Sequence, residues 1–308
     1  MSVRQREKRR RIDVHADDYA LSIHVSQEII QCIKDGKIDS ISVMPNMSCF
    51  EQALDMLKKE IPFEKMPKYS VHLNLMEGHC LSDPTDVPDL VDDRGYFKVS
   101  WGSLVIDSFC YGRKRNAVRE QIKIEMRRQI ERVESALHPE WPVRIDSHQH
   151  THMIPVVFDA LMDAVREGNY KLEYIRVPEE PQWPFAKAVS LWTTYSPINA
   201  VKNVVLNAFA KRNRRVIRAM GLPYDLLWGL MFSGKMDRPR VEKLWPDMMR
   251  YIERRDRTLE ILFHPGRALP EEIGEEYVKD GFVRFHLSEG RDIEKEAVYW
   301  ITEEHGVH

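Results

Sequence analysis

Short runs of apolar residues alternate along the chain with longer segments whose apolar residues recur every three or four positions. The clearest periodic segment is 116–137, where Val118, Ile122, Met126, Ile130, Val133 and Leu137 fall on one helical face. Helices are predicted over 22–35, 48–59, 116–137, 155–167 and 238–254. Strands are predicted over 12–16, 38–44, 69–75, 143–148, 172–177, 226–232 and 259–263. This alternation is typical of right-handed βαβ units and predicts an α/β fold, a distorted TIM-barrel-like (β/α) barrel with about seven parallel strands.

Two insertions interrupt the alternation, near 76–115 and near 180–222. The first is rich in Asp, Pro and Gly and is predicted to be a long loop or lid above the site. From residue 181 to 224 the chain has no Asp or Glu but seven basic residues: Lys187, Lys202, Lys211, Arg212, Arg214, Arg215 and Arg218. One helical face there would consist of Ile198, Val201, Val205, Ala208 and Phe209. We expect an exposed helix packed on the barrel; the alternative is a basic amphipathic surface for an anionic or lipid-linked partner.

Composition adds limits to this picture. The 308 residues are 43% hydrophobic and 31% charged with a net charge of −2, which suits one domain over 11–308 and gives no bulk attraction to nucleic acid. Residues 1–10 form a basic N-terminal tail, expected to be solvated rather than an arm for nucleic acid or phospholipid. The four cysteines form no CxxC pair, and no apolar run approaches the roughly 18 residues of a membrane span. We therefore expect a cytoplasmic protein, with a homodimer expected on general grounds only.

Polar residues capable of chemistry follow four of the predicted strands. Asp17 and Asp18 end the first strand, His72 lies in the third, His148 ends the fourth, and His264 follows the last. In a parallel barrel, the carboxyl ends of the strands meet at the active-site face, so these side chains should converge. Each residue alone has a simpler explanation: the aspartates suit a helix N-cap and turn, and a lone histidine is more often a satisfied core group.

The segment IDSHQHTHMIP, residues 145–155, gives the strongest local signal. In an extended chain, Asp146, His148, His150 and His152 would share one face, and their burial would be costly unless hydrogen bonds or a cation satisfied them. One site does not need this many polar residues on a single strand face, so the strand is expected to end near His148. His148 is then the ligand, and His150 and His152 support it or contact substrate; the alternative is a polar surface loop.

Together, Asp18, His72 and His148 form a predicted set of one carboxylate and two imidazoles. Three protein ligands leave positions open for water, as catalytic metal sites require. These ligands suit one divalent ion, Zn²⁺ or Mg²⁺, with Mn²⁺ or Co²⁺ as alternatives. A further group is expected to support the ligands or contact substrate: Asn46, Glu77, Asp146 and Arg176.

The motifs HADDYALS, VHLNLMEG, RIDSHQHTHMIP and LFHPG, in this order, resemble those of the YdjC/ChbG-type carbohydrate deacetylases. The resemblance covers about residues 11–298 and implies metal-dependent removal of acetyl groups from N-acetylated amino sugars. It implies Asp17 as general base and His264 as general acid, beside the ligands Asp18, His72 and His148. His15 departs from the usual Asn, Tyr19-Ala20 from Phe-Gly, and His79-Cys80 from Lys-Pro. GLPYDLLWGLMFSGKM (221–236) resembles the hopanoid-associated branch, which suggests a lipid-linked amino sugar.

Two other functions are compatible with the same residues. A metal-dependent phosphoesterase or other barrel hydrolase uses similar ligands, and a non-catalytic sugar-binding protein could keep the same fold. The chain has neither a Gly-rich phosphate motif nor a GxSxG motif, so nucleotide cofactors and serine catalysis are not supported. Tyr96, Trp101 and Trp183 are candidates for stacking against a sugar ring.

Overall fold

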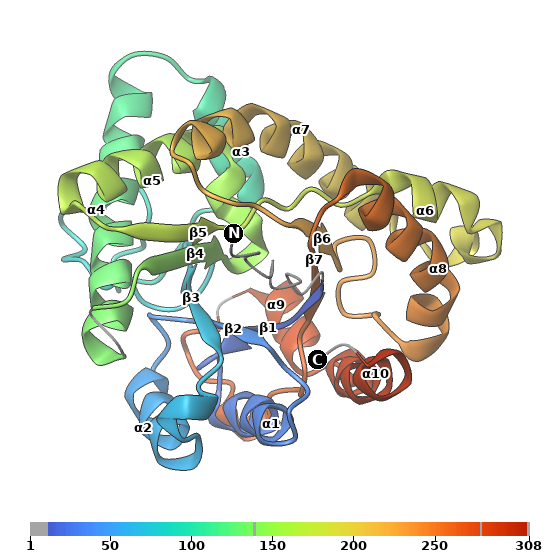
Figure 1. The fold of residues 1–308 in the computed structure, drawn as a ribbon. Coiled ribbons are helices and arrows are strands. Elements are labelled where there is room, and N and C mark those ends of the chain that lie inside the picture. The colour runs from blue at the N-terminus through green and yellow to red at the C-terminus, as the bar shows by residue number, and fades with distance from the viewer. Residues whose placement is uncertain (1–11, 138–139, 278, 307–308) are drawn as a thin grey trace, which may run out of the picture.

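The computed structural model describes residues 12–137, 140–277 and 279–306, so the predicted basic tail lies outside the described residues. One parallel sheet has the order β5-β4-β3-β2-β1-β7-β6. Its strands are β1 (Ile12–Tyr19), β2 (Ser40–Val43), β3 (Lys68–Leu73), β4 (Val143–Ser147), β5 (Leu172–Ile175), β6 (Leu226–Trp228) and β7 (Leu259–Phe263). The sheet curls so that its edges approach, and Leu227 N–H donates to the carbonyl of Glu179, which follows β5, at 3.1 Å (Figure 1). The predicted barrel-like α/β fold is confirmed, in the form of a curled half-barrel.

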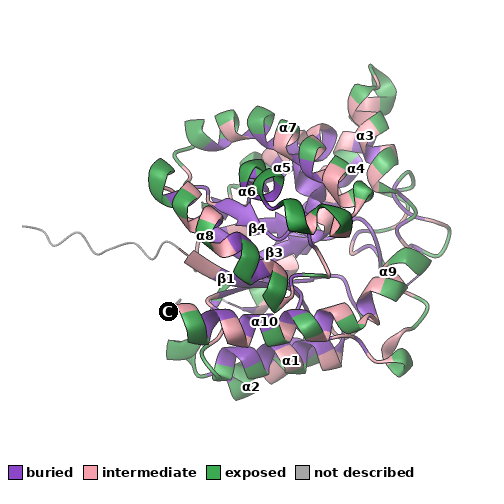
Figure 2. Cartoon of the chain, turned by 90° about the vertical axis from the view of Figure 1, so that its right-hand side faces the viewer, coloured by how far each residue is buried: buried purple, intermediate pink, exposed green. Residues whose placement is uncertain are grey.

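Helices surround this sheet and bury their apolar faces on it (Figures 1 and 2). They include α1 (Ile23–Lys34), α2 (Phe50–Glu60), α4 (Arg113–Ala136), α5 (Pro155–Gly168), α8 (Arg238–Arg255) and α10 (Glu289–His305). The predicted face of α4 is buried at Val118, Ile122, Met126, Ile130 and Val133. Helix α10 and the short helix α9 (Asp280–His286) were not predicted. In the part of the chain that the structure describes, no helix combines the length and apolar character needed to cross a membrane.

The first insertion is only partly the loop that its composition predicted. Its second half forms helix α3 (Trp101–Phe109), and α4 begins three residues earlier than the predicted 116. Ser100 starts α3 with a capping box, because its hydroxyl accepts from Ser103 N–H at 3.0 Å while Ser103 Oγ accepts from Ser100 N–H at 2.9 Å. The many Asp, Pro and Gly residues before Ser100 hid this helix. Whether the segment acts as a lid stays a prediction.

The second insertion contains α6 (Gln182–Lys187), the 3₁₀ segment η3 (Val189–Thr194) and α7 (Pro197–Ala219). The prediction of which face of this helix packs on the barrel is wrong, because Ile198 and Val201 are 78% and 65% exposed. The buried face consists instead of Asn203, Leu206, Ala210, Asn213 and Ile217. The two asparagines tolerate burial because Asn203 Nδ2 donates to Glu180 and Asn213 Nδ2 donates to the Met153 carbonyl at 2.8 Å. Sequence periodicity counted them as polar and therefore missed this face.

Glu180 connects the two edges of the curled sheet. Its carboxylate accepts from the backbone N–H groups of Gly229 at 2.7 Å and of Leu230 and Met231 at 3.0 Å, all just after β6. Burial raises the pKa of this carboxyl to about 7, although these N–H groups act in the opposite direction. The buried acid therefore links β5 to β6 and should make stability depend on pH.

We expect the free energy of unfolding to fall as pH rises from 4.5, the ordinary pKa of Glu180, through about 7. In this window the unfolded chain has released the proton that the folded chain retains, which costs on the order of 3 kcal/mol. Urea unfolding at pH 5 and pH 8 measures the change. The variant Glu180→Gln should lack this component, and an equal pH-dependent change in both proteins would contradict the prediction.

Candidate metal centre and active site

The end of β1 turns two carboxylates into the open end of the barrel. The pairing register between β1 and β2 shifts between Ala16 and Tyr19, and within this irregular stretch Asp18 has a φ of 69°. Aspartate tolerates this left-handed region better than most residues, at some conformational cost. Asp17 and Asp18 are both buried, and each contacts a different set of neighbours.

Asp18, His72 and His148 come together as the sequence predicted. Asp18 Oδ1 lies 3.2 Å from His148 Nδ1 and 3.6 Å from His72 Nε2. The centroids of the two imidazole rings are 5.8 Å apart. One ligand atom from each of the three residues lies within 4.8 Å of the others. All three are buried, although they come from the ends of β1, β3 and β4. This arrangement can present one oxygen and two nitrogen ligands to a single cation.

The His72 ring is oriented by Asp146, the residue paired with it on the neighbouring strand β4. Asp146 Oδ1 lies 2.6 Å from His72 Nδ1, which leaves His72 Nε2 facing Asp18. A carboxylate on the distal nitrogen is the usual support of a metal-binding histidine. Burial favours the neutral form of Asp146, but Arg176 and His72 hold its pKa below the ordinary value, so it remains an acceptor.

Asp17 is held by the buried guanidinium of Arg176. Arg176 donates to both carboxylate oxygens of Asp17, at 2.9 and 3.0 Å, and its Nη2 lies 3.2 Å from Asp146. Its Nε lies 2.7 Å from Glu260 Oε1. Burial would raise the pKa of Asp17, but Arg176, with His72 and His15, holds it well below the usual range. Asp17 therefore stays ionised and able to accept a proton.

His15, noted in the sequence only as a departure from the usual Asn, contributes to this network. Its Nδ1 lies 2.6 Å from Ser40 Oγ, and its Nε2 lies 2.6 Å from Ser42 Oγ and 3.1 Å from Asp17 Oδ1. Ser40 and Ser42 of β2 therefore orient the His15 ring, and the ring in turn contacts the Asp17 carboxylate.

A second group, Glu77, His148 and His286, also has the spacing of a metal site and shares His148 with the first. Glu77 Oε1 lies 3.1 Å from His148 Nε2 and 2.8 Å from His286 Nε2. Among the described residues, Glu77 Oε2 and His286 Nδ1 are buried without a hydrogen-bond partner, so polar capacity remains for an ion or water. We favour Asp18, His72 and His148, because a carboxylate outside this group holds the far ring nitrogen of each of its histidines, Asp146 at His72 Nδ1 and Glu77 at His148 Nε2. In the second group, His286 Nδ1 has no such support from the described residues. The mixed nitrogen and oxygen donors of the favoured group fit Zn²⁺, Mn²⁺ or Co²⁺ and accept Mg²⁺ less well.

His264 follows β7 and is positioned by Glu294 of α10. Glu294 Oε2 accepts from the His264 backbone N–H at 2.7 Å and lies 3.2 Å from His264 Nδ1. This contact engages one ring nitrogen, Nδ1, and orients the imidazole. Burial would raise the pKa of the Asp18 carboxyl, but His148 and Arg291, with a smaller contribution from His264, hold it well below the ordinary value.

The other predicted residues differ in whether the protein itself satisfies their polar side-chain atoms. His152 uses both ring nitrogens within the protein, at 2.5 Å to Ser147 Oγ and 2.8 Å to the Arg176 carbonyl, so these contacts fix its ring in place. Asn46 Nδ2 donates to the carbonyls of Glu77 and His79 and fixes the loop after β3. His150 is buried with a φ of 55°, and its Nδ1 has no partner among the described residues.

Two of the three predicted stacking aromatics pack against other rings of the protein, and the third is exposed. Tyr96 packs edge-on against His79 and Trp101 lies near Phe209, with ring centroids 5.5 and 6.2 Å apart, while Trp183 is 65% exposed. Their role in sugar binding stays a prediction.

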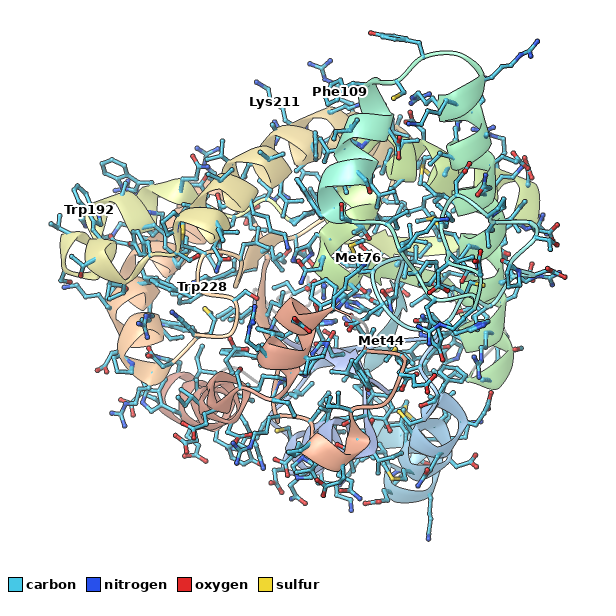
Figure 3. All side chains as sticks on the ribbon, turned by 180° about the vertical axis from the view of Figure 1, so that it is seen from behind. Met44, Met76, Phe109, Trp192, Lys211 and Trp228 are labelled. Carbon is cyan, nitrogen blue, oxygen red and sulfur yellow. The ribbon has the colours of Figure 1, made fainter. Side chains whose placement is uncertain are left out.

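Sequence reasoning missed the contributions of α9 and α10. Arg291 of α10 is buried and donates to Asp18 Oδ2 at 2.7 Å, which leaves Oδ1 to face the histidines. Phe282 and Phe285 of α9 pack edge-on against His148 and His264. In Figure 1, α9 lies behind the sheet. Figure 3 is seen from that side and labels Met44 and Met76, which follow β2 and β3 in the chain. The C-terminal segment therefore covers the barrel mouth.

Comparison with known proteins agrees with this geometry. The family model of YdjC-like proteins matches residues 11–299. A carbohydrate deacetylase of Thermoanaerobacter pseudethanolicus is 32% identical over 156 residues, which cover 51% of this chain and 57% of that relative. A carbohydrate deacetylase of Clostridium beijerinckii is 29% identical over 180 residues, covering 58% and 66%. The chain thus spans somewhat less than two thirds of these relatives.

A solved structure from Enterococcus faecalis V583, described as a candidate cellobiose-phosphate cleavage protein, has the same fold. It superposes with a TM-score of 0.59 over 96% of this chain and 94% of that chain, at 18% identity. Because the family match extends across nearly all described residues, from β1 to α10, the chain belongs to the family of YdjC-like proteins.

Proposed function

We propose that this chain is a metal-dependent hydrolase that removes the acetyl group from an N-acetylated amino sugar. The observation that carries the proposal is the buried cluster of Asp18, His72 and His148 beside Asp17 and His264. The similarity to proteins named carbohydrate deacetylase supports both the reaction and the substrate class. The four free cysteines suit the cytoplasm as its location.

One divalent cation, zinc or magnesium with manganese or cobalt as alternatives, would be held by Asp18, His72 and His148. Bound there, it would polarise the acetyl carbonyl and make water more acidic. Asp146 and Arg291 would keep the ligands in place, since each engages the part of a ligand that faces away from the cluster. The fit rests on the donor set and on the buried polar atoms left unpaired nearby.

The chain's own residues supply the proton transfers. Asp17, kept ionised by Arg176, accepts a proton as water attacks the acetyl carbon and a C–O bond forms. His264 then donates a proton to the sugar nitrogen as the C–N bond breaks, which releases acetate and a free amine. Glu294 keeps the ring oriented for this transfer.

The experiment that tests the proposal uses the cation-loaded protein with N-acetylated chito-oligosaccharides and with lipid-linked N-acetylglucosamine. We expect acetate and free amine in equal amounts from at least one substrate, and loss of this activity after treatment with a chelator. Release of phosphate from phosphorylated sugars, with no acetate from any amino sugar, would instead support the phosphoesterase alternative. No product from any substrate would support a non-catalytic sugar-binding protein.

A further inference from the structure

Exposed apolar side chains are concentrated in the two insertions. Of the thirteen large apolar side chains that the described residues expose, eleven belong to these insertions. They are Ile106, Phe109, Tyr111, Trp183, Val189, Trp192, Ile198, Val201, Val204, Val216 and Met220. Figure 3 shows the labelled Trp192, Lys211 and Phe109 along one upper border, and Figures 1 and 2 place α3, α6 and α7 on that side. Exposed apolar residues gathered in this way mark interaction sites more often than scattered ones do.

Helix α7 carries this surface on its outer face. Its exposed stripe begins with Ile198, Val201 and Val204 and continues with Lys211 and Arg215, while the opposite stripe is buried. A surface helix that only covers a barrel usually exposes polar residues of both charges. Here the outer stripe is apolar in the first half and basic in the second.

The second insertion, which supplies most of this surface, has only basic residues among its charged side chains. The chain as a whole carries −2, yet residues 181–224 contain seven Lys or Arg and no Asp or Glu. Within the described residues, no carboxylate lies at ion-pair distance from Lys211, Arg215 or Arg218, whereas Lys187, Arg212 and Arg214 pair with Asp247, Asp159 and Glu179. Arg218 donates to the Tyr224 hydroxyl, so Lys211 and Arg215 are the exposed cations best placed to meet an anionic partner.

We propose that this basic apolar edge, formed by the exposed residues of α3, α6, η3 and α7, docks on a membrane surface that contains anionic lipid. Aliphatic and tryptophan side chains suit the boundary between headgroups and acyl chains, and nearby cations add electrostatic attraction to anionic headgroups. A second copy of the chain is a poorer occupant, because a symmetric contact would bring Lys211 and Arg215 of one copy close to the same cations of the other.

The inner face of α7 connects this edge to the candidate metal centre. Lys202 Nζ donates to Gln149, the residue after His148, and Asn213 Nδ2 donates to the Met153 carbonyl at the end of the same 3₁₀ segment, η2 (His148–Met153). The docking itself does not depend on the proposed function. If the chain is a deacetylase, this geometry favours a lipid-linked amino sugar presented at the membrane.

The test is flotation of the full chain with vesicles of phosphatidylcholine and phosphatidylglycerol, in a molar ratio of about two to one, and with pure phosphatidylcholine. We expect binding to the anionic vesicles that weakens as salt is raised. The double variant Lys211→Glu/Arg215→Glu should weaken binding at least about tenfold. Val201→Ser/Val204→Ser should also weaken it, which separates insertion from charge attraction alone.

The matched control is Lys58→Glu/Lys59→Glu, which makes the same charge change on exposed positions of α2. It should bind the vesicles like the unmodified chain. The proposal is overturned if the unmodified chain does not float, or if the control weakens binding as much as the α7 variant. It is also overturned if light scattering shows a dimer that the α7 substitutions disperse. Circular dichroism confirms that each variant is folded.

Discussion

Asp17→Asn is expected to lower kcat by about 10²–10⁴-fold while the protein still binds its cation. The amide keeps the size of the side chain and can still accept one hydrogen bond from Arg176, but it cannot take a proton from water. The carboxylate it replaces is held ionised by Arg176, so it is in the form that can accept a proton across the neutral pH range. Initial rates of acetate release and the metal content per chain measure the two quantities.

Asp13→Asn is the matched control for this variant. Asp13 lies on the same strand, four residues earlier, and contacts Ser40 rather than Arg176. Its substitution should leave kcat within about twofold, as expected of a group that takes no part in proton transfer. If Asp17→Asn and Asp13→Asn have equal activity, Asp17 is not the base, and a non-catalytic role for the barrel becomes the better account.

Arg176→Met is expected to lower the free energy of unfolding by about 3–5 kcal/mol. Arg176 is the shared partner of three buried carboxylates, on Asp17, Asp146 and Glu260. Removing its charge leaves those groups buried without compensation, although methionine keeps much of the side-chain volume. Denaturant unfolding followed by circular dichroism measures the loss.

Arg166→Met provides the comparison at the surface. Arg166 pairs with Asp163 at 3.2 Å and its side chain is 73% exposed, so its loss should cost no more than about 1 kcal/mol. Similar losses for the two variants would mean that the Arg176 network contributes no more than a surface pair.

The candidate metal ligands could be predicted because they follow the strands. Asp18, His72 and His148 each lie at the carboxyl end of an apolar strand, and parallel strands place those ends at one edge of the sheet. The strands and the covering helices could be predicted from the periodicity of apolar residues, because an element that buries one face has apolar residues at regular intervals.

The supporting residues could not be predicted, because their local pattern resembles a solvated helix. Arg291 and Glu294 lie in the charged sequence EGRDIEKE, where nothing distinguishes buried from exposed charges. Their burial depends on partners about 30 or more residues distant, namely Asp18 and His264. The buried face of α7 was hidden in the same way, because Asn203 and Asn213 satisfy their amides through tertiary contacts.

The most direct test of the central claim is calorimetric titration of the cation-free protein with Zn²⁺ and Mn²⁺, together with metal content by mass spectrometry. We predict one cation per chain, with affinity lost by roughly a hundredfold or more in Asp18→Ala, His72→Ala and His148→Ala. His286→Ala should retain the cation, since His286 belongs only to the alternative group with Glu77 and His148. Unchanged binding in His72→Ala, or loss of binding in His286→Ala alone, would contradict the account.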